Sequence, residues 1–327
     1  DATQIGAGDI GAVAKLGSAL TGDTLSEKGN IAVAPIDFPN PSLSVAVYPK
    51  AKGDEEKITA AFNRMMEEDR TISVYMNNET KEQILEALGE QHIDVIISRL
   101  KSKFGAEVEL KKPKIAYRET IRGTAEAEGK HKKQSGGHGQ YGHVKIRFSP
   151  CEEEFIFEEE VVGGAVPKNY FPAVEKGLRE CMAEGPLAGY PVTGVKAVLY
   201  DGSYHDVDSN ELSFKMAAAI AYKEGLKNAK PVLLEPVYNL EVTCADSMMG
   251  DVIGDLNSKR GRILGMQSVE EGMSVVTAQV PYAEISEYAV DLRALTQGLG
   301  TFEMKFDHYE DVPAKMAEKI IADRKEA

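Results

Sequence analysis

The sequence of 327 residues has few cysteines, only Cys151, Cys181 and Cys244. No two of them form a CxxC pair, and an odd number of thiols does not complete a set of disulfides, so neither a zinc framework nor a disulfide scaffold is indicated. A reducing, cytoplasmic compartment is the expectation. The sequence also lacks a run of about eighteen apolar residues, so we expect no membrane span.

The chain has no initiator Met, no signal peptide and no GxxxxGK[ST] motif of the P-loop NTPases. It opens with DATQIGAGDIGAVAKLGSALTGDTL, a glycine-spaced, turn-rich stretch typical of the tail of a β-barrel. We therefore expect a piece of a longer protein.

Positive charge is scarce but concentrated. The net charge of −14 argues against a protein that coats nucleic acid, because phosphates repel an acidic surface. Residues 111–147 nevertheless contain ten Lys or Arg and three Glu, whereas residues 148–211 contain four Lys or Arg and thirteen Asp or Glu. One basic segment on an acidic body indicates a single contact with an anionic partner.

Helix and strand patterns alternate between residues 42 and 110. Strands are predicted at 42–49, 71–76, 82–88 and 106–110. Two helices are predicted from apolar residues at helical spacing, Ile58, Ala61, Phe62, Met65 and Met66 in the first and Ile93, Ile96, Ile97, Leu100 and Phe104 in the second. Gly105 ends the second helix.

The same order of elements returns near the C-terminus. Strands are predicted at 237–243, 262–267, 273–280 and 301–309. The helices between them carry Met249, Val252, Ile253 and Leu256, and then Ile285, Tyr288, Ala289, Leu292 and Leu295. Two βαββαβ units form an internal repeat typical of the ferredoxin-like split βαβ motif. The predicted fold class is α+β and multidomain.

The middle of the chain carries a different pattern. One predicted helix has Phe171, Val174, Leu178, Cys181 and Met182 on its apolar face, and a second carries Leu212, Met216, Ala219 and Ile220. Asp208 followed by Glu211 has the spacing of an N-cap with its N3 acid. A short helix around Met316, Ile320 and Ile321 ends the chain.

The stretch Lys130–Phe148 reads KHKKQSGGHGQYGHVKIRF, and Gly137, Gly139 and Gly142 match the dinucleotide-binding pattern GxGxxG. That loop needs a strand before it and a helix after it, whereas the residues after Gly142 alternate as a strand. A metal site could be drawn from its three histidines, His131, His138 and His143. No carboxylate or thiol lies among them, however, and the lysines would repel a dication. Both interpretations are disfavoured.

A β-hairpin is the remaining interpretation, with GKHKK and YGHVKIRF as arms and QSGGHGQ as the tip. Lysines and histidines suit phosphates, and glycines let the backbone approach a ligand closely. Gln134, Ser135, Gln140 and Tyr141 offer hydrogen bonds and a stacking face. A solvated loop explains the charge equally well, but the richness in Gly, Gln and His favours RNA contact.

The motif SYHDVDS at residues 203–209 places Ser203, His205 and Asp206 close together. Neighbours in sequence make a poor catalytic triad, because the members normally converge from separate elements. A polar turn between a strand and a helix accounts for the motif without chemistry.

Long strings spread along the whole chain resemble the translation elongation factor G family. They are YRETI (117–121), EGKHKKQSGGHGQYGHV (128–144), GPLAGYPV (185–192), GSYHDVDS (202–209), AKPVLLEP (229–236) and GDVIGDLNSKRGRILG (250–265).

The resemblance implies four parts. They are the end of a β-barrel second domain (1–36), a ferredoxin-like third domain (37–112), a fourth domain with a left-handed βαβ core and projecting tip loops (113–235), and a ferredoxin-like fifth domain with a C-terminal helix (236–327). The fourth domain would be similar to ribosomal proteins. The GTP-binding first domain, which holds GTP and Mg, would be missing. The parent would then be a GTPase, while this chain has no catalytic centre and no cofactor.

The implied function is ribosome binding and tRNA–mRNA translocation in elongation, with the fourth-domain tip in the decoding site. The implied partners are the ribosome with its rRNA and proteins, tRNA and mRNA, and the protein would be a cytoplasmic monomer. The residues implied to contact RNA are Lys130, Lys132, Lys133, Gln134, Ser135, Gly136, Gly137, His138, Gly139, Gln140, Tyr141, Ser203, Tyr204, His205, Asp206, Lys259, Arg260 and Arg262. His205 would face codon and anticodon.

The sequence departs from the family in one respect. Many members carry Arg where His138 stands, and the acidic CEEEFIFEEE follows the hairpin here. An elongation-factor-G-like paralogue in ribosome recycling, or in another ribosome-bound role, is therefore the alternative.

Overall fold

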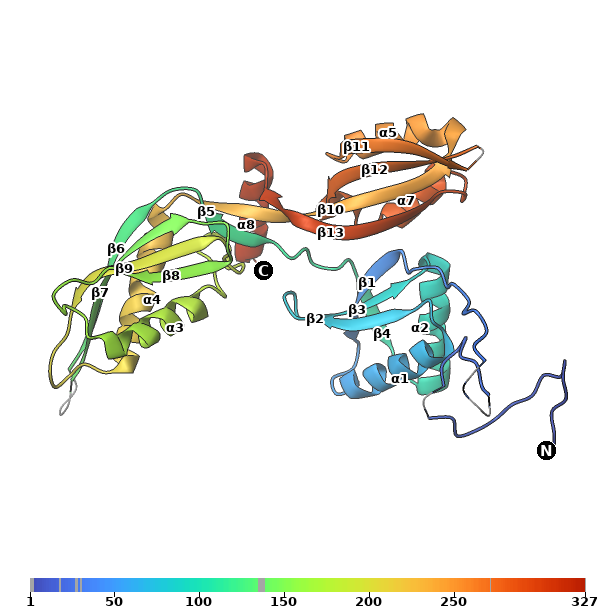
Figure 1. Cartoon of the computed structure of the whole chain (residues 1–327), viewed down its shortest axis with the longest axis horizontal. Helices are drawn as coiled ribbons and strands as arrows, with labels where there is room; N and C mark the ends of the chain where they lie inside the picture. The colour runs from blue at the N-terminus through green and yellow to red at the C-terminus, as the bar shows by residue number, and fades with distance from the viewer. Residues whose placement is uncertain are drawn as a thin grey trace.

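The structure, a computed structural model, describes residues 3–17, 19–26, 29, 31–134, 139–270 and 272–326. Its strands form separate, mostly antiparallel sheets with helices packed on them (Figure 1). The predicted α+β, multidomain class is confirmed. Within the described residues, no helix is both long enough and apolar enough to cross a membrane.

The first unit is a four-stranded sheet with two helices. In chain order it consists of β1 (Leu43–Pro49), α1 (Glu55–Glu68), β2 (Ser73–Asn77), β3 (Glu82–Ala87), α2 (Glu90–Phe104) and β4 (Val108–Lys111). The strand order β2-β3-β1-β4 is that of the predicted ferredoxin-like motif. Gly105 ends α2 in the left-handed conformation, with φ of 62°, as its sequence position predicts.

The last unit repeats this arrangement. Its elements are β10 (Pro231–Ala245), a 3-10 turn (Asp246–Met248), α5 (Met249–Ser258), β11 (Arg262–Glu270), β12 (Met273–Pro281), α6 (Tyr282–Ile285), α7 (Tyr288–Leu295) and β13 (Thr301–Asp311), followed by α8 (Ala314–Glu326). The strand order is β11-β12-β10-β13. The single helix predicted around Tyr288 is split into α6 and α7.

The middle unit lies between these two in sequence. It consists of β5 (Arg118–Ile121), β6 (Ala125–Lys133), β7 (Gln140–Pro150), β8 (Phe155–Glu159), a 3-10 turn (Lys168–Tyr170), α3 (Phe171–Cys181), β9 (Val195–Ser203) and α4 (Glu211–Asn228). The sheet order is β6-β7-β9-β8. β8 and β9 pair in parallel and are joined through α3, which makes a βαβ unit.

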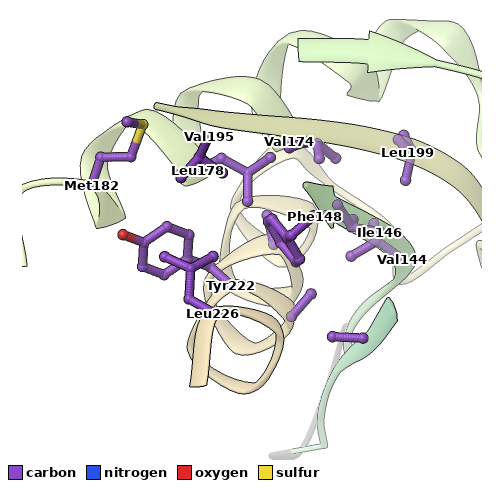
Figure 2. Close-up of a cluster of buried hydrophobic side chains, with 14 of the residues drawn as sticks. Val144, Ile146, Phe148, Val174, Leu178, Met182, Val195, Leu199, Tyr222 and Leu226 are labelled. Carbon is purple, nitrogen blue, oxygen red and sulfur yellow. The ribbon is translucent and has the colours of Figure 1, made fainter. Parts of the chain in front are cut away.

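The core of the middle unit lies between its sheet and helices α3 and α4. Val144, Ile146 and Phe148 alternate along β7 and point to the helices, where Leu178 and Leu226 meet them (Figure 2). All five side chains are fully buried. The alternation that predicted a strand after Gly142 therefore also marks its buried face.

Helix α4 differs from its prediction in two ways. Leu212, Met216 and Ile220 are 54%, 42% and 41% exposed, and the buried face is made by other residues, Phe214, Ala217, Ala218 and Ala221. The helix is apolar on most sides, so spacing alone did not identify the inward face. The N-cap is Asn210, which accepts a hydrogen bond from Ser213 N–H, and not Asp208.

The described residues before Leu43 form no strand. Apolar side chains there, such as Ile10, Val13 and Ile31, are exposed. A barrel strand needs neighbours to pair with, and none of the described strands pairs with this segment. The assignment of residues 1–36 to the end of a barrel stays a prediction.

Strand β10 belongs to two units. Its residues Pro231–Leu234 pair with β5, and residues from Leu234 onward pair with β13 and β12. The middle unit and the last unit are therefore joined by one continuous strand, which Figure 1 shows running between them.

The β6–β7 hairpin lies unusually close to α4. A Cβ at Gly142 would be 2.3 Å from Ser213 O, and a Cβ at Gly129 would be 1.9 Å from Ala217 O. Both clashes are with backbone that cannot rotate away. Only glycine at these two positions lets the strands lie against the helix.

We expect Gly142→Ala to lower the free energy of unfolding by about 3 kcal/mol or more, because the added methyl forces the hairpin away from α4. Differential scanning calorimetry of the chain measures the change. Gly254→Ala is the matched control, since this glycine lies inside α5 with no atom within 4 Å of an added Cβ. Alanine there should be neutral or stabilise by up to about 1 kcal/mol. Equal effects of the two substitutions would contradict the packing argument.

Candidate nucleic-acid interface

The β6–β7 hairpin brings the basic stretch to one end of the middle unit. The two strands pair in register from Ala125 with Phe148 to Lys133 with Gln140, as two arms. The described part of the chain thus supports the predicted hairpin. The predicted tip residues Ser135, Gly136, Gly137 and His138 lie outside the described residues.

The lysines of the hairpin point to solvent. Lys130, Lys132 and Lys133 are exposed, and none of them forms an ion pair with a described residue. The Lys130 ammonium lies 5.8 Å from the centre of the Tyr141 ring. These cations are available for an anionic partner, and the nearby aromatic ring offers a stacking surface.

The interior of the hairpin end is ordered by polar side chains. His131 Nε2 lies 2.9 Å from Gln140 Oε1 across the two strands. Ser203 Oγ, at the end of β9, lies 2.8 Å from Tyr141 Oη and 2.7 Å from His143 Nδ1. These contacts fix the start of the loop at 203–208 beside the hairpin.

The second loop stands next to the first. Tyr204, His205 and Asp206 are exposed, and the His205 ring centre is 6.4 Å from that of Tyr141. The structure therefore brings two segments together that are far apart in sequence. With the lysines they form a polar and aromatic surface, which we call the tip surface (Lys130, Lys132, Lys133, Gln134, Gln140, Tyr141, Ser203, Tyr204, His205 and Asp206).

The disfavoured interpretations can be compared with the geometry only where their residues are described. Ser203 Oγ bonds Tyr141 and His143, not His205, so the triad suggested by SYHDVDS is not assembled. Among the described residues, no group of three or more His, Cys, Asp or Glu is placed to hold a metal ion. Of the glycines in GxGxxG, Gly142 serves packing, since it lies against α4.

Two of the three basic residues expected in the last unit are engaged within the protein. Lys259 Nζ lies 3.2 Å from Asp255 Oδ1 and 3.0 Å from Asp291 Oδ2. Arg260 makes a bidentate pair with Glu235, at 2.7 and 2.9 Å, and a further bond to Glu284 at 2.9 Å.

Arg262 is the most exposed of the three, with 62% of its side chain accessible. It bonds Gln279 at 2.6 Å and Glu310 at 3.1 Å on the sheet surface. Lys259 and Arg260 already direct donors to carboxylates of the chain, and Arg262 is the most exposed of the three. Contact of the three residues with RNA stays a prediction.

Sequence reasoning missed the residues that hold the two loops together, Asp208 and Ser209. Ser209 Oγ donates to Tyr141 O at 2.9 Å, and Asp208 Oδ1 accepts from Gly139 N–H at 2.9 Å. Asp208 was assigned to capping α4. Asn210 lies three residues before Ser213, which is the spacing of an N-cap. This signal could have shown that Asp208 does not cap α4.

Three family models match successive parts of the chain. They are described as "Elongation Factor G, domain III" for residues 38–112, "Elongation factor G, domain IV" for 113–230 and "Elongation factor G C-terminus" for 232–320. Elongation factor G of Thermotoga neapolitana is 48% identical over 319 residues, which is 96% of this chain and 46% of that protein.

A crystal structure of a Thermus thermophilus protein superposes with a TM-score of 0.81 and 44% identity, over 89% of this chain and 44% of that one. The chain therefore spans about half the length of the relatives that it matches.

The pairing of Arg260 leads to a stability prediction. Glu235 is 2% exposed, so Arg260→Ala leaves a buried carboxylate without its partner and should cost about 3 kcal/mol of unfolding free energy. Arg262→Ala, at an exposed site, should cost less than about 1 kcal/mol. Urea denaturation of both variants measures the difference. An Arg260 variant as stable as the Arg262 variant would show that the buried pair does not matter.

His308 on β13 leads to a pH prediction. Its Nδ1 lies 2.5 Å from Asp307 Oδ2 and its Nε2 2.8 Å from Glu310 Oε1. Burial lowers the pKa of His308, but the bonds and charges of Glu310 and Asp307 outweigh it and leave the pKa raised above 6.5. Since the folded pKa exceeds the unfolded one, this stabilisation is complete below about pH 6.5 and is lost as pH rises through the folded pKa.

The unfolding free energy should therefore fall across that window in the parent chain, and fall less in His308→Gln. Denaturant titrations on either side of the window provide the measurement. The same slope in both proteins would exclude His308 as the source.

Proposed function

Because the chain belongs to the elongation factor G family, we propose that it is the ribosome-binding part of a translational GTPase that promotes tRNA–mRNA translocation. The tip surface would enter the decoding site of the small ribosomal subunit. The parent would act as a cytoplasmic monomer. We also propose that the four parts of the chain end at residues 36, 112, 235 and 327.

The observation that carries the proposal is the tip surface itself. A hairpin with three exposed lysines, none paired with a described carboxylate, lies beside a loop with exposed Tyr204 and His205, at one end of an otherwise acidic chain. Lysines bind phosphates without reading sequence, while aromatic rings and amides contact bases. This combination suits an RNA partner whose sequence varies, as codons and anticodons do.

No residue of this chain is assigned to GTP or Mg²⁺. The sequence has no P-loop motif, and the family resemblance assigns both ligands to a domain outside residues 1–327. The role of this part is then mechanical. Its contacts with RNA would favour the translocated state by being stronger in that state than before it.

The last unit would approach large-subunit RNA through Arg262. Lys259 and Arg260, which pair with carboxylates of the chain, are included in the proposed contact on their sequence alone. Ser135, Gly136, Gly137 and His138 are included in the proposed contact on their sequence alone.

A paralogue in ribosome recycling is the second candidate, favoured by His138 in place of the common Arg and by the acidic residues 152–160. Cells depleted of their translocase decide between the two. Growth restored by the full-length parent supports translocation. Absent growth together with retained recycling activity supports the paralogue.

The proposal predicts that Lys132→Glu with Lys133→Glu weakens binding of the chain to ribosomes by about tenfold or more. It should also lower the slope of log affinity against log salt by about 2, because fewer counterions are released. Binding is measured by sedimentation with ribosomes carrying mRNA and tRNA, over a range of salt concentrations.

The matched control reverses Lys223 and Lys227, two exposed lysines toward the other end of α4. It makes the same change in net charge away from the tip and should leave the salt slope nearly unchanged. An equal loss in both double variants would show that total charge, and not the tip surface, governs binding.

A further inference from the structure

Asp208 connects the two segments of the tip surface. Its Oδ1 accepts from Gly139 N–H at 2.9 Å, and its backbone oxygen accepts from Tyr141 N–H at 2.9 Å. Ser209 Oγ adds a bond to Tyr141 O at 2.9 Å. Three hydrogen bonds therefore tie residues 139–141 to residues 208–209.

Gly139 is fitted to this contact. A Cβ at that position would lie 2.9 Å from Asp208 Cγ, closer than side chains pack. The carboxylate is 24% exposed, so water competes with it only in part. Since Asn210 caps α4, Asp208 is not required by the helix.

The same loop determines how His205 is presented. His205 N–H donates to Ser209 Oγ at 2.9 Å, which fixes its backbone. Its Nδ1 faces the backbone N–H groups of Asp208 at 3.3 Å and Val207 at 3.4 Å. Asp208 Oδ2 also lies 3.4 Å from this Nδ1, at ion-pair distance but without the geometry of a hydrogen bond. The two backbone N–H groups are directed at Nδ1, so we assign it as the acceptor, and the neutral ring then carries its proton on Nε2.

The other side of the ring is open. The His205 side chain is 55% exposed, and no described residue bonds its Nε2. An Nε2–H group in this position is a single, directed donor. It suits an acceptor on RNA, such as a base carbonyl, a ring nitrogen or a 2′-hydroxyl oxygen.

We propose that Asp208 is a positioning residue, which ties the two loops together and thereby holds His205 as an outward Nε2–H donor to an RNA acceptor. The RNA part of this inference rests on the proposed function. The loop tie and the histidine tautomer belong to the free chain and can be measured without a ribosome.

The first measurement is a long-range ¹H–¹⁵N spectrum of the 327-residue chain with ¹⁵N-labelled histidine, at about pH 8, where an ordinary imidazole is neutral. The His205 signals are assigned by their loss in His205→Gln. The expected parent spectrum shows the Nε2–H tautomer. Asp208→Ala should shift it toward a mixture of tautomers, while Asp208→Asn, which keeps an acceptor oxygen for Gly139, should largely restore it.

Glu211→Ala is the matched control, because it removes an exposed acid three residues away and should leave the His205 signals unchanged. An unchanged His205 spectrum in Asp208→Ala would overturn the proposal. So would a parent spectrum dominated by the Nδ1–H tautomer.

The second measurement is affinity for ribosomes carrying mRNA and tRNA. Asp208→Ala and His205→Ala should each weaken binding about fivefold to tenfold, the scale of one hydrogen bond. The double variant should be no weaker than either single one, because Asp208 acts through His205. If the loss of affinity in the double variant equals the product of the two single losses, Asp208 does not act through His205. A parent chain that does not bind ribosomes sinks the proposed function, while the spectra still decide whether Asp208 positions His205.

Discussion

The close contact between the β6–β7 hairpin and α4 is the constraint on which the middle unit depends. Gly129 and Gly142 remove the side chains that would hold the strands off the helix. The strands then bury Val144, Ile146 and Phe148 against α3 and α4, and their unburied residues are free to carry lysines. The basic arm and the hydrophobic core are therefore two faces of the same pair of strands.

Much of this arrangement could be predicted from the sequence, because periodicity is a local signal. The two βαββαβ units, the strand after Gly142 and the end of α2 at Gly105 follow from spacings within a few residues. Helix α4 was predicted as a helix, but its inward face was not, because apolar residues lie on most of its sides. The break between α6 and α7 carries no Gly or Pro to mark it.

The residue types of the site could be predicted from the sequence. Which of those residues are already paired within the protein could be predicted less well. The lysines and His205 stood out by residue type, but the partners of Lys259 and Arg260 did not. Glu235 is distant in sequence from Arg260, and only the fold brings it close. The same holds for Asp208 and Gly139, separated by 69 positions. Charge in a sequence shows what a surface could bind, whereas the fold determines which charges are already neutralised.

Strand β10 has a mechanical consequence. Its first residues are bonded to β5 and its later residues to β12 and β13, so a load along it would shear many hydrogen bonds at once instead of opening them one by one. Such a strand resists stretching, so a force on the β6–β7 hairpin would be transmitted to the last unit. Residues 112–117, between β4 and β5, form no helix or strand and connect the first unit to the middle one. The middle and last units therefore share a continuous strand, whereas the first unit contacts the last one through side chains, with Ala289 in its core and Lys112 paired with Glu287.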